Sequence, residues 1–279
     1  MQQSHRQAAP PAGDPQRATV RLLWTGGWDS TFQLLRLLLV HGKHVTPYYL
    51  MRERRPSTPV EVATMARIRS ALNDRFPATR TLLHPTRFFD VARIAPDPAI
   101  TDAYEHALQQ RHLGRQYEWL AWFCVEQRID EIELCIHRDD KAHAVLDPFV
   151  IEADEGAGYR THRFDARHRG RREDAAELHR LFRHFSFPLF ETTKLEMASE
   201  AQSRGWQPIM DMTWFCHSPL RGKPCGICNP CLYTIEEGLG HRLPRWSRIR
   251  AAVFRNVLLP FKAPIVATLR LLGLRRADE

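Results

Sequence analysis

The sequence lacks an apolar run long enough to cross a membrane. Its longest apolar segments are broken by Arg, Lys or Pro well before the roughly 20 residues that a spanning helix needs. The first 18 residues are rich in Gln, Ala and Pro and contain no apolar signal-peptide core. We therefore expect a soluble, cytoplasmic protein that begins with a disordered leader, residues 1–17.

Acidic residues are scarce at the C-terminal end. Residues 242–279 hold nine Lys or Arg and two acidic residues, so this segment carries +7 of the formal net charge of +8. The rest of the chain is nearly neutral, which argues against nucleic-acid binding by the body of the protein. In residues 244–274 bases are interspersed with large apolar residues. This pattern leaves three interpretations open: packing on the body or in a homodimer, contact with an anionic membrane surface, or binding of RNA phosphates.

A glycine turn follows an apolar run at residues 18–24 that predicts a buried strand. Its sequence is Trp24-Thr25-Gly26-Gly27-Trp28-Asp29-Ser30-Thr31. Paired glycines allow backbone N–H groups to surround an anion, and the helix that follows offers its unpaired N–H groups to the same anion. A carboxylate on the first turn can hold Mg²⁺, and the hydroxyl groups can donate to phosphate oxygens. The stretch predicts a phosphate or pyrophosphate site; the alternative is an ordinary strand–turn–helix with a capping residue.

The motif lacks the marks of two common nucleotide loops. No Gly-Lys-Ser/Thr follows it, so it is not a Walker loop, and the third glycine of a dinucleotide fingerprint is missing. Any nucleotide that binds here is therefore held by another type of loop.

The order of the predicted elements favours an α/β fold. Strands are predicted at residues 18–24, 44–50, 81–83 and 131–136, and helices at 32–40, 59–76, 99–113, 117–128, 174–184 and 193–204. This alternation predicts a parallel sheet with helices on both faces, with ligands at the C-terminal strand ends. Residues 152–173 are polar and charged, which is typical of a long loop or mobile lid.

Four of the six cysteines lie close together near the C-terminus. Cys216, Cys225, Cys228 and Cys231 follow the pattern C-x8-C-x2-C-x2-C. Four thiolates from one short segment suit tetrahedral Zn²⁺ in a closed, structural site. An iron–sulfur cluster also uses such spacing and remains the alternative. Cys124 and Cys135 lie in apolar surroundings and are expected in the core.

The two motifs together resemble a known family. The glycine turn resembles the Ser-Gly-Gly-x-Asp-Ser signature of PP-loop ATP pyrophosphatases, and residues 211–216 and 224–231 resemble the zinc motif of the 7-cyano-7-deazaguanine synthases of queuosine biosynthesis. The resemblance implies a PP-loop (adenine nucleotide alpha-hydrolase-like) domain over residues 18–240, including a zinc segment at 211–233. A basic amphipathic tail, residues 241–279, follows.

The resemblance also implies a reaction. ATP with Mg²⁺ adenylates a carboxylate or amide, pyrophosphate leaves, and ammonia from a donor then gives an amide or a nitrile. It implies that the glycine turn, from Trp24 to Thr31, binds the nucleotide. The implied catalytic residues are Asp29, Ser30, Arg115, Lys194, and Asp139 or Asp140.

The chain departs from the family at the acceptor site. Residues 52–57 and 137–143 replace the segments with which the synthases hold the deazaguanine, so we expect a different acceptor. Within the second segment, His137 and His143 fit structural roles better than catalytic ones. Two other functions stay open: a tRNA-modifying enzyme of the thiolation type, which needs a nucleophilic cysteine, and a non-catalytic, zinc-stabilised nucleotide-binding accessory protein.

Overall fold

The computed structural model describes residues 19–52, 55–110, 113–154, 156, 158–167 and 172–258. The predicted leader and the end of the predicted tail, residues 259–279, lie outside the described residues.

A seven-stranded sheet forms the centre of the molecule, in the order β3-β2-β1-β4-β7-β6-β5. The strands β3, β2, β1, β4 and β7 run parallel to one another, and β6 pairs antiparallel with both β7 and β5. The strands are β1 (Val20–Leu23), β2 (Val45–Met51), β3 (Arg87–Asp90), β4 (Ile132–Glu133), β5 (Val150–Asp154), β6 (Arg160–Phe164) and β7 (Phe185–Ser186).

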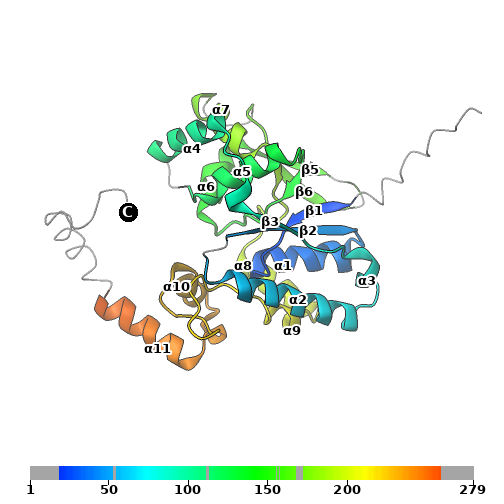
Figure 1. Ribbon diagram of the computed structural model, residues 1–279. Coiled ribbons are helices and arrows are strands. Elements are labelled where there is room, and N and C mark those ends of the chain that lie inside the picture. The colour runs from blue at the N-terminus through cyan, green and yellow to red at the C-terminus, as the bar shows by residue number, and fades with distance from the viewer. Residues whose placement is uncertain are drawn as a thin grey trace, which may run out of the picture.

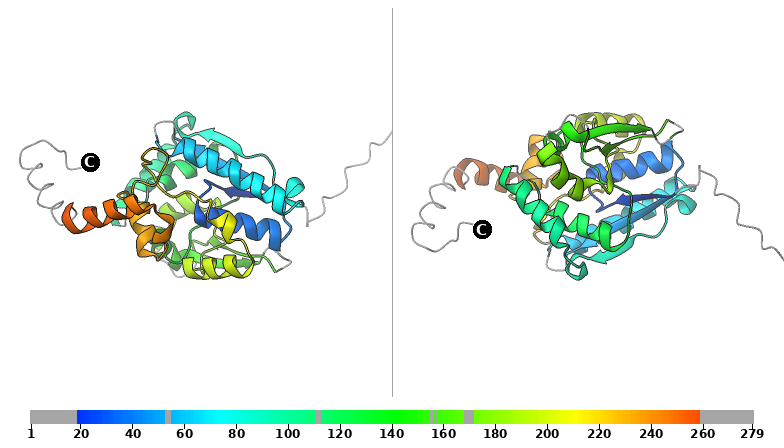
Figure 2. Two further views of the ribbon diagram at one scale, coloured as in Figure 1. Left: turned by 90° about the horizontal axis from the view of Figure 1, so that it is seen from below. Right: turned by 90° about the horizontal axis from the view of Figure 1, so that it is seen from above.

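Helices cover both faces of the sheet, which confirms the predicted α/β class (Figure 1). One face carries α1 (Trp28–Leu35), α2 (Thr58–Arg75), α8 (Lys194–Ser203) and α9 (Gln207–Met210). The other carries α4 (Pro98–Gln110), α5 (Gln116–Glu126), α6 (Lys141–Leu146) and α7 (Arg172–Phe182). Figure 2 views these two layers from either side of the sheet.

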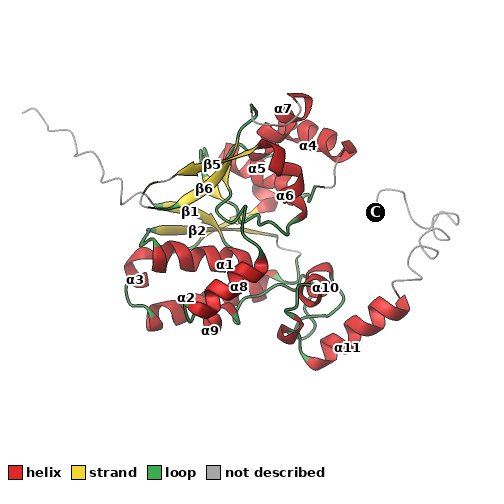
Figure 3. Ribbon diagram, turned by 180° about the vertical axis from the view of Figure 1, so that it is seen from behind, coloured by secondary structure: helices red, strands yellow, loops and turns green. Residues whose placement is uncertain are grey.

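The remaining elements are shorter or lie beyond the sheet. Beside the sheet stand α3 (Thr79–Leu82), η2 (Arg36–Val40), η3 (Val91–Arg93) and η4 (Asp147–Phe149). The C-terminal part consists of α10 (Asn229–Glu236), η5 (Gly240–Arg242), α11 (Arg245–Val253) and η6 (Phe254–Leu258). Figure 3 shows α10 and α11 at one end of the molecule, away from the strands.

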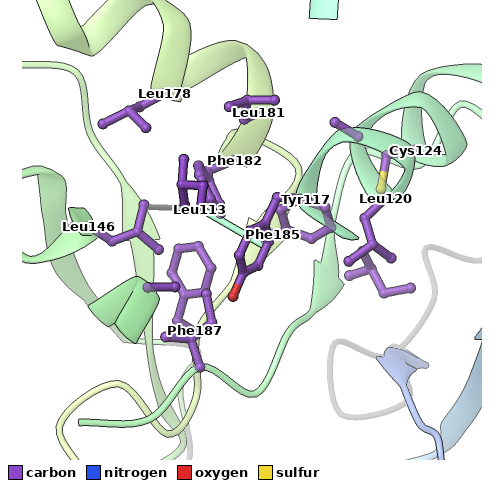
Figure 4. Packing of buried hydrophobic residues seen from close by; sticks show 14 of the residues in the cluster. Leu113, Tyr117, Leu120, Cys124, Leu146, Leu178, Leu181, Phe182, Phe185 and Phe187 are labelled. Carbon is purple, nitrogen blue, oxygen red and sulfur yellow. The ribbon is translucent and has the colours of Figure 1, made fainter. Parts of the chain in front are cut away.

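Two hydrophobic clusters form the core, one on each face of the sheet. Side chains that follow one another along a strand point to opposite faces, so Tyr48 packs in one cluster and Tyr49 in the other. In the first cluster, the Tyr117 ring of α5 lies 5.1 Å from the Phe182 ring of α7, and Phe187 packs beside them (Figure 4).

The predicted third strand at residues 81–83 is wrong. The chain forms the helical turn α3 there, in which the Leu83 N–H donates to the Thr79 carbonyl, and Leu83 alone bridges to β2. The third strand is β3, whose sequence Arg-Phe-Phe-Asp lies at the sheet edge with half-exposed or exposed side chains. An edge strand needs no continuous apolar run, so the hydrophobic pattern did not reveal it.

The loop predicted at residues 152–173 is also wrong. Residues 152–154 end β5 and residues 160–164 form β6, and the two strands pair antiparallel, with Glu152 opposite His162 and Asp154 opposite Arg160. The charged side chains point largely to solvent, and Arg160 pairs with Glu152 at 2.9 Å. A polar sequence is compatible with a strand at a sheet edge, and this pair makes the sheet mixed rather than wholly parallel.

Candidate functional site

Two adjoining cavities lie where the strand order reverses, at the carboxyl ends of β1 and β4. In open α/β sheets this switch point is the usual ligand position. The cavities have volumes of about 530 Å³ and about 250 Å³. They share four lining residues: Asp29, Lys194, Tyr233 and Glu237.

The glycine turn borders the smaller cavity. Gly26 has φ of +71°, and a Cβ there would lie 3.2 Å from the side chains of Thr64 and Met65, so only glycine fits without strain. Gly27 precedes α1, and no side chain caps the start of this helix. Gly27, Thr25 and Trp28 line the cavity, so the positive end of α1 meets the open space.

Asp29 stands between the two cavities with one orphaned oxygen. Its Oδ1 is buried and has no hydrogen-bond partner among the described residues. His137 Nε2 lies 3.8 Å from this oxygen, and the N–H of Asp139 donates to His137 Nδ1 over 3.2 Å. Because Nδ1 accepts, the ring proton sits on Nε2 and faces Asp29. This arrangement orients a carboxylate that can bind a cation.

Lys194 lies beside Asp29 at the start of α8. A capping box between Thr193 and Glu196 begins this helix, and Lys194 Nζ donates to both oxygens of Glu237 over 2.8 and 2.9 Å. Burial lowers the pKa of Lys194, but the charges of Asp29 and Glu237 outweigh burial and raise it. Lys194 is therefore a fixed cation between the two cavities.

Arg242 adds a second cation that the sequence pattern did not reveal. Its guanidinium lies 4.9 Å from the Trp28 ring centre and 5.0 Å from that of Phe215, and it donates to the Thr213 carbonyl over 2.7 Å. Burial lowers its pKa to about 10, so the group stays charged at neutral pH. In the sequence Arg242 looks like one of many bases of the tail, because its aromatic partners lie far away along the chain.

The structure separates the residues predicted for the site. Thr25, Gly27, Trp28, Asp29 and Lys194 line one or both cavities, and Asp139 and Asp140 line the larger one. The others line neither cavity. Trp24 and Thr31 are buried, and the Trp24 indole N–H donates a hydrogen bond to the Thr31 hydroxyl. Ser30 is partly buried on α1. Gly26 lies in the turn and packs against Thr64 and Met65.

Arg115 is also absent from the cavity walls. Its side chain is 85% exposed and pairs with Glu118 at 3.5 Å. Its neighbours Gly114, Gln116 and Tyr117 line the larger cavity instead. Asp140 contributes to that wall while its Oδ1 caps α6 by accepting from the Ala142 N–H. Sequence reasoning missed Glu237 and Tyr233, which α10 and the turn after it bring to the shared wall.

The four clustered cysteines converge on one point and can hold a metal ion such as zinc. Their sulfur atoms lie within 4.8 Å of one another. Three of the separations are 3.5 Å (Cys228 to Cys231), 3.8 Å (Cys216 to Cys228) and 3.9 Å (Cys225 to Cys231). A tetrahedron of sulfurs around zinc, with bonds of about 2.3 Å, has edges of about 3.8 Å. A cluster of several iron atoms needs more space between its thiolates, so these distances favour a single ion.

Local backbone groups favour thiolates at this centre. The N–H of Cys225 points to Cys216 Sγ over 3.2 Å, and the N–H of Cys228 points to Cys225 Sγ over 3.3 Å. Gly226 provides the tight turn, with φ of +86°. Cys216, Cys225 and Cys231 are buried, so the centre is closed, as structural metal sites are.

Neither the protein-family models nor the curated proteins include a match to this chain.

Among the described residues, one further group has ligand atoms close enough to share a metal ion: His143, Asp147 and Glu191. Both carboxylates are exposed, and His143 stacks on Phe190 with ring centres 4.2 Å apart. We assign no metal to this group. It lies outside both cavity walls, so it plays no part in the candidate site.

Proposed function

We propose that the protein is an ATP-dependent ligase of the PP-loop type, which adenylates a carboxylate or an amide. One observation carries the proposal. The uncapped start of α1, behind a glycine turn, borders a cavity whose shared wall with a larger cavity holds Asp29 and Lys194. A helix start of this kind binds phosphates, and the larger cavity has room for a second substrate.

The residues present fit ATP and Mg²⁺. The smaller cavity meets the positive end of α1 and the buried cation of Arg242, which suits a polyphosphate. Asp29, whose Oδ1 lacks a hydrogen-bond partner among the described residues, would hold Mg²⁺. When bound, that ion neutralises charge on the phosphate oxygens.

The proposed step is displacement at the α-phosphorus. A carboxylate or amide oxygen of the acceptor attacks this atom, and the bond to the leaving pyrophosphate breaks. The N–H groups at the start of α1 and the side chains of Lys194 and Arg242 stabilise the charge that grows on the pyrophosphate. Where the acceptor is a carboxylate, ammonia attacks the carbonyl carbon of the acyl adenylate, and the bond to AMP breaks to give an amide. A second activation of that amide would give a nitrile.

The acceptor belongs in the larger cavity. Its wall combines the Tyr117 and Tyr233 rings with the carboxylates of Asp139 and Asp140. Asp139 Oδ2 accepts a hydrogen bond from the backbone N–H of Lys194 over 2.8 Å. This bond links the wall of the larger cavity to Lys194, which also lines the smaller cavity. Asp139 and Asp140 belong to residues 137–143, one of the two segments that depart from the family, so we propose an acceptor other than the deazaguanine.

We further propose that the metal is zinc in a structural role. Its four protein ligands leave no position for a substrate. The thiolation alternative is less favoured, because burial raises the pKa of the Cys124 thiol to about 12 and that of the Cys135 thiol well above its ordinary value. A nucleophilic cysteine needs a lowered pKa.

The test is turnover of α-labelled ATP by the zinc-loaded full-length protein, with panels of carboxylic acids and primary amides and with ammonium as the nitrogen donor. We expect AMP and pyrophosphate in equal amounts, dependent on Mg²⁺ and on one acceptor class. ATP that binds but stays intact with every acceptor would instead support the accessory-protein alternative. Release of ADP and phosphate would place bond cleavage at the wrong phosphate and reject the proposal.

A further inference from the structure

The last described helix carries an exposed apolar stripe. Helix α11 and η6 together span residues 245–258 and extend beyond α10, away from the sheet (Figures 1 and 3). Trp246 is 73% exposed, and Ile249, Val253 and Val257 are 43–52% exposed. Their spacing of three, four and four residues places them on one side of the helix, over about 16 Å.

The opposite side of this helix is anchored to residues 211–233, which carry the four clustered cysteines and are called the metal segment here. Ser247 and Ala251 are 1% exposed, and Ser247 Oγ donates to the Pro224 carbonyl. Arg250 Nε donates to the Cys225 carbonyl over 2.8 Å. These contacts with the backbone of Pro224 and Cys225 fix the orientation of the helix about its axis. The apolar stripe therefore faces away from the metal segment.

Charge identifies what can cover the stripe. Residues 242–277 contain nine Lys or Arg and no Asp or Glu. Arg245 and Arg248 are exposed beside the stripe. A helix with Trp and aliphatic residues on one side and bases next to them is typical of segments that lie in the headgroup region of a membrane. A second copy of the same helix would bring like charges together.

The sequence continues the same pattern where the stripe ends. Residues 259–277 contain further large apolar residues and four more bases, again without an acid. No helix of the described residues is long and apolar enough to span a membrane.

We propose that the protein docks on an anionic lipid bilayer through the stripe formed by Trp246, Ile249, Val253 and Val257. The apolar side chains enter the headgroup boundary, and Arg245 and Arg248 pair with lipid phosphates. This docking would hold the metal segment against the membrane. The proposal rests on the surface of α11 and η6 and holds whether or not the protein adenylates an acceptor.

Vesicle flotation with the full-length protein tests the proposal. The vesicles contain phosphatidylcholine alone or phosphatidylcholine with phosphatidylglycerol. The stripe variant is Trp246→Gln with Val253→Gln. The matched control is Leu195→Gln with Leu220→Gln, because these leucines have the same exposed fractions, 73% and 50%, elsewhere on the surface. A charge variant, Arg245→Gln with Arg248→Gln, is compared with Arg93→Gln and Arg160→Gln, which remove the same charge at exposed sites.

We expect the wild type and both controls to float with anionic vesicles and not with phosphatidylcholine alone. The stripe variant should bind at least about tenfold more weakly, and added salt should weaken the binding of the wild type. The proposal is overturned if the wild type does not float with anionic vesicles. It is also overturned if the stripe variant floats with them as well as its control does. A dimer that the stripe variant dissociates, without vesicle binding, assigns the stripe to a second copy and also overturns it.

Discussion

The backbone N–H of Trp214 donates a hydrogen bond to the carbonyl oxygen of Gly26, with 2.9 Å between the two atoms. Gly26 lies in the turn after β1, and Trp214 precedes the first metal ligand, Cys216. The Trp214 indole N–H in turn donates to the Cys216 carbonyl over 2.7 Å. The metal segment and the glycine turn are therefore joined by a short chain of hydrogen bonds, so the order of one depends on the other.

Removal of the metal should weaken nucleotide binding as well as stability. We expect Cys228→Ser, or a strong chelator, to lower the free energy of unfolding by more than about 4 kcal/mol. The reason is that the free energy of metal binding would no longer stabilise the folded metal segment. ATP affinity should fall with it, through the contact between Trp214 and Gly26. Metal content, thermal unfolding and equilibrium ATP binding measure the three effects.

Cys124→Ala serves as the control for metal removal. Cys124 is buried in the core of α5, so this variant should lose some stability yet keep one metal ion per chain. A Cys228→Ser protein that binds ATP as tightly as the wild type would show that the two segments are independent.

Lys194 and Arg115 should respond very differently to the loss of charge. The family resemblance implies a catalytic role for both, but Lys194 lines the two cavities and Arg115 is exposed outside them. We expect Lys194→Gln to reduce the rate of pyrophosphate release at least about 100-fold, and Arg115→Gln to change it less than about threefold. Steady-state kinetics with saturating ATP separates them. An equal loss of rate in the two variants would mean that Arg115 takes part in the reaction.

Stability should fall as pH rises through neutrality because of Glu133. This residue is buried, and it accepts hydrogen bonds from the Tyr159 hydroxyl and, over 2.9 Å, from Gln33 Nε2. Burial outweighs these bonds and raises the pKa of Glu133 to about 7. The folded protein therefore holds a proton that the unfolded chain releases near pH 4.5, so stability present at low pH is lost above the folded pKa.

The Glu133 effect should amount to about 2 kcal/mol between about pH 5 and about pH 8. Urea unfolding at both pH values measures it. Glu133→Gln should remove most of the difference, whereas Glu152→Gln, at an exposed position on β5, should preserve it. A pH dependence that survives in Glu133→Gln would assign the effect to other groups.

Two glycines of the metal segment should tolerate alanine unequally. Both have positive φ, but a Cβ on Gly226 would lie 2.1 Å from the Ser247 carbonyl oxygen, whereas one on Gly222 meets nothing within 4 Å. We expect Gly222→Ala to cost about 1 kcal/mol from backbone strain alone. Gly226→Ala should cost at least about 3 kcal/mol, because it also separates α11 from the metal segment. Thermal unfolding compares the two, and equal costs would contradict the close packing.

Local patterns predicted the three central parallel strands, β1, β2 and β4, and missed the other four, including the two-residue parallel strand β7. The apolar runs around Leu22 and Tyr48 predicted β1 and β2, since buried strands require apolar side chains on both faces. The edge strands β3 and β5, and β6 beside β5, carry charged residues such as Arg87, Glu152 and Arg160. These side chains reach water from a strand as easily as from a loop, so composition alone does not separate the two.

The sequence by itself determined the α/β class, the glycine turn and the four-cysteine centre, because each depends on residues that are close together along the chain. Tertiary structure alone decided which residues meet at the cavities. It brought Lys194, Glu237 and Arg242 to Asp29, and it left Arg115 in solvent. The physical reason is that those contacts depend on how α8, α10 and the metal segment pack against the end of β1, which no local pattern encodes.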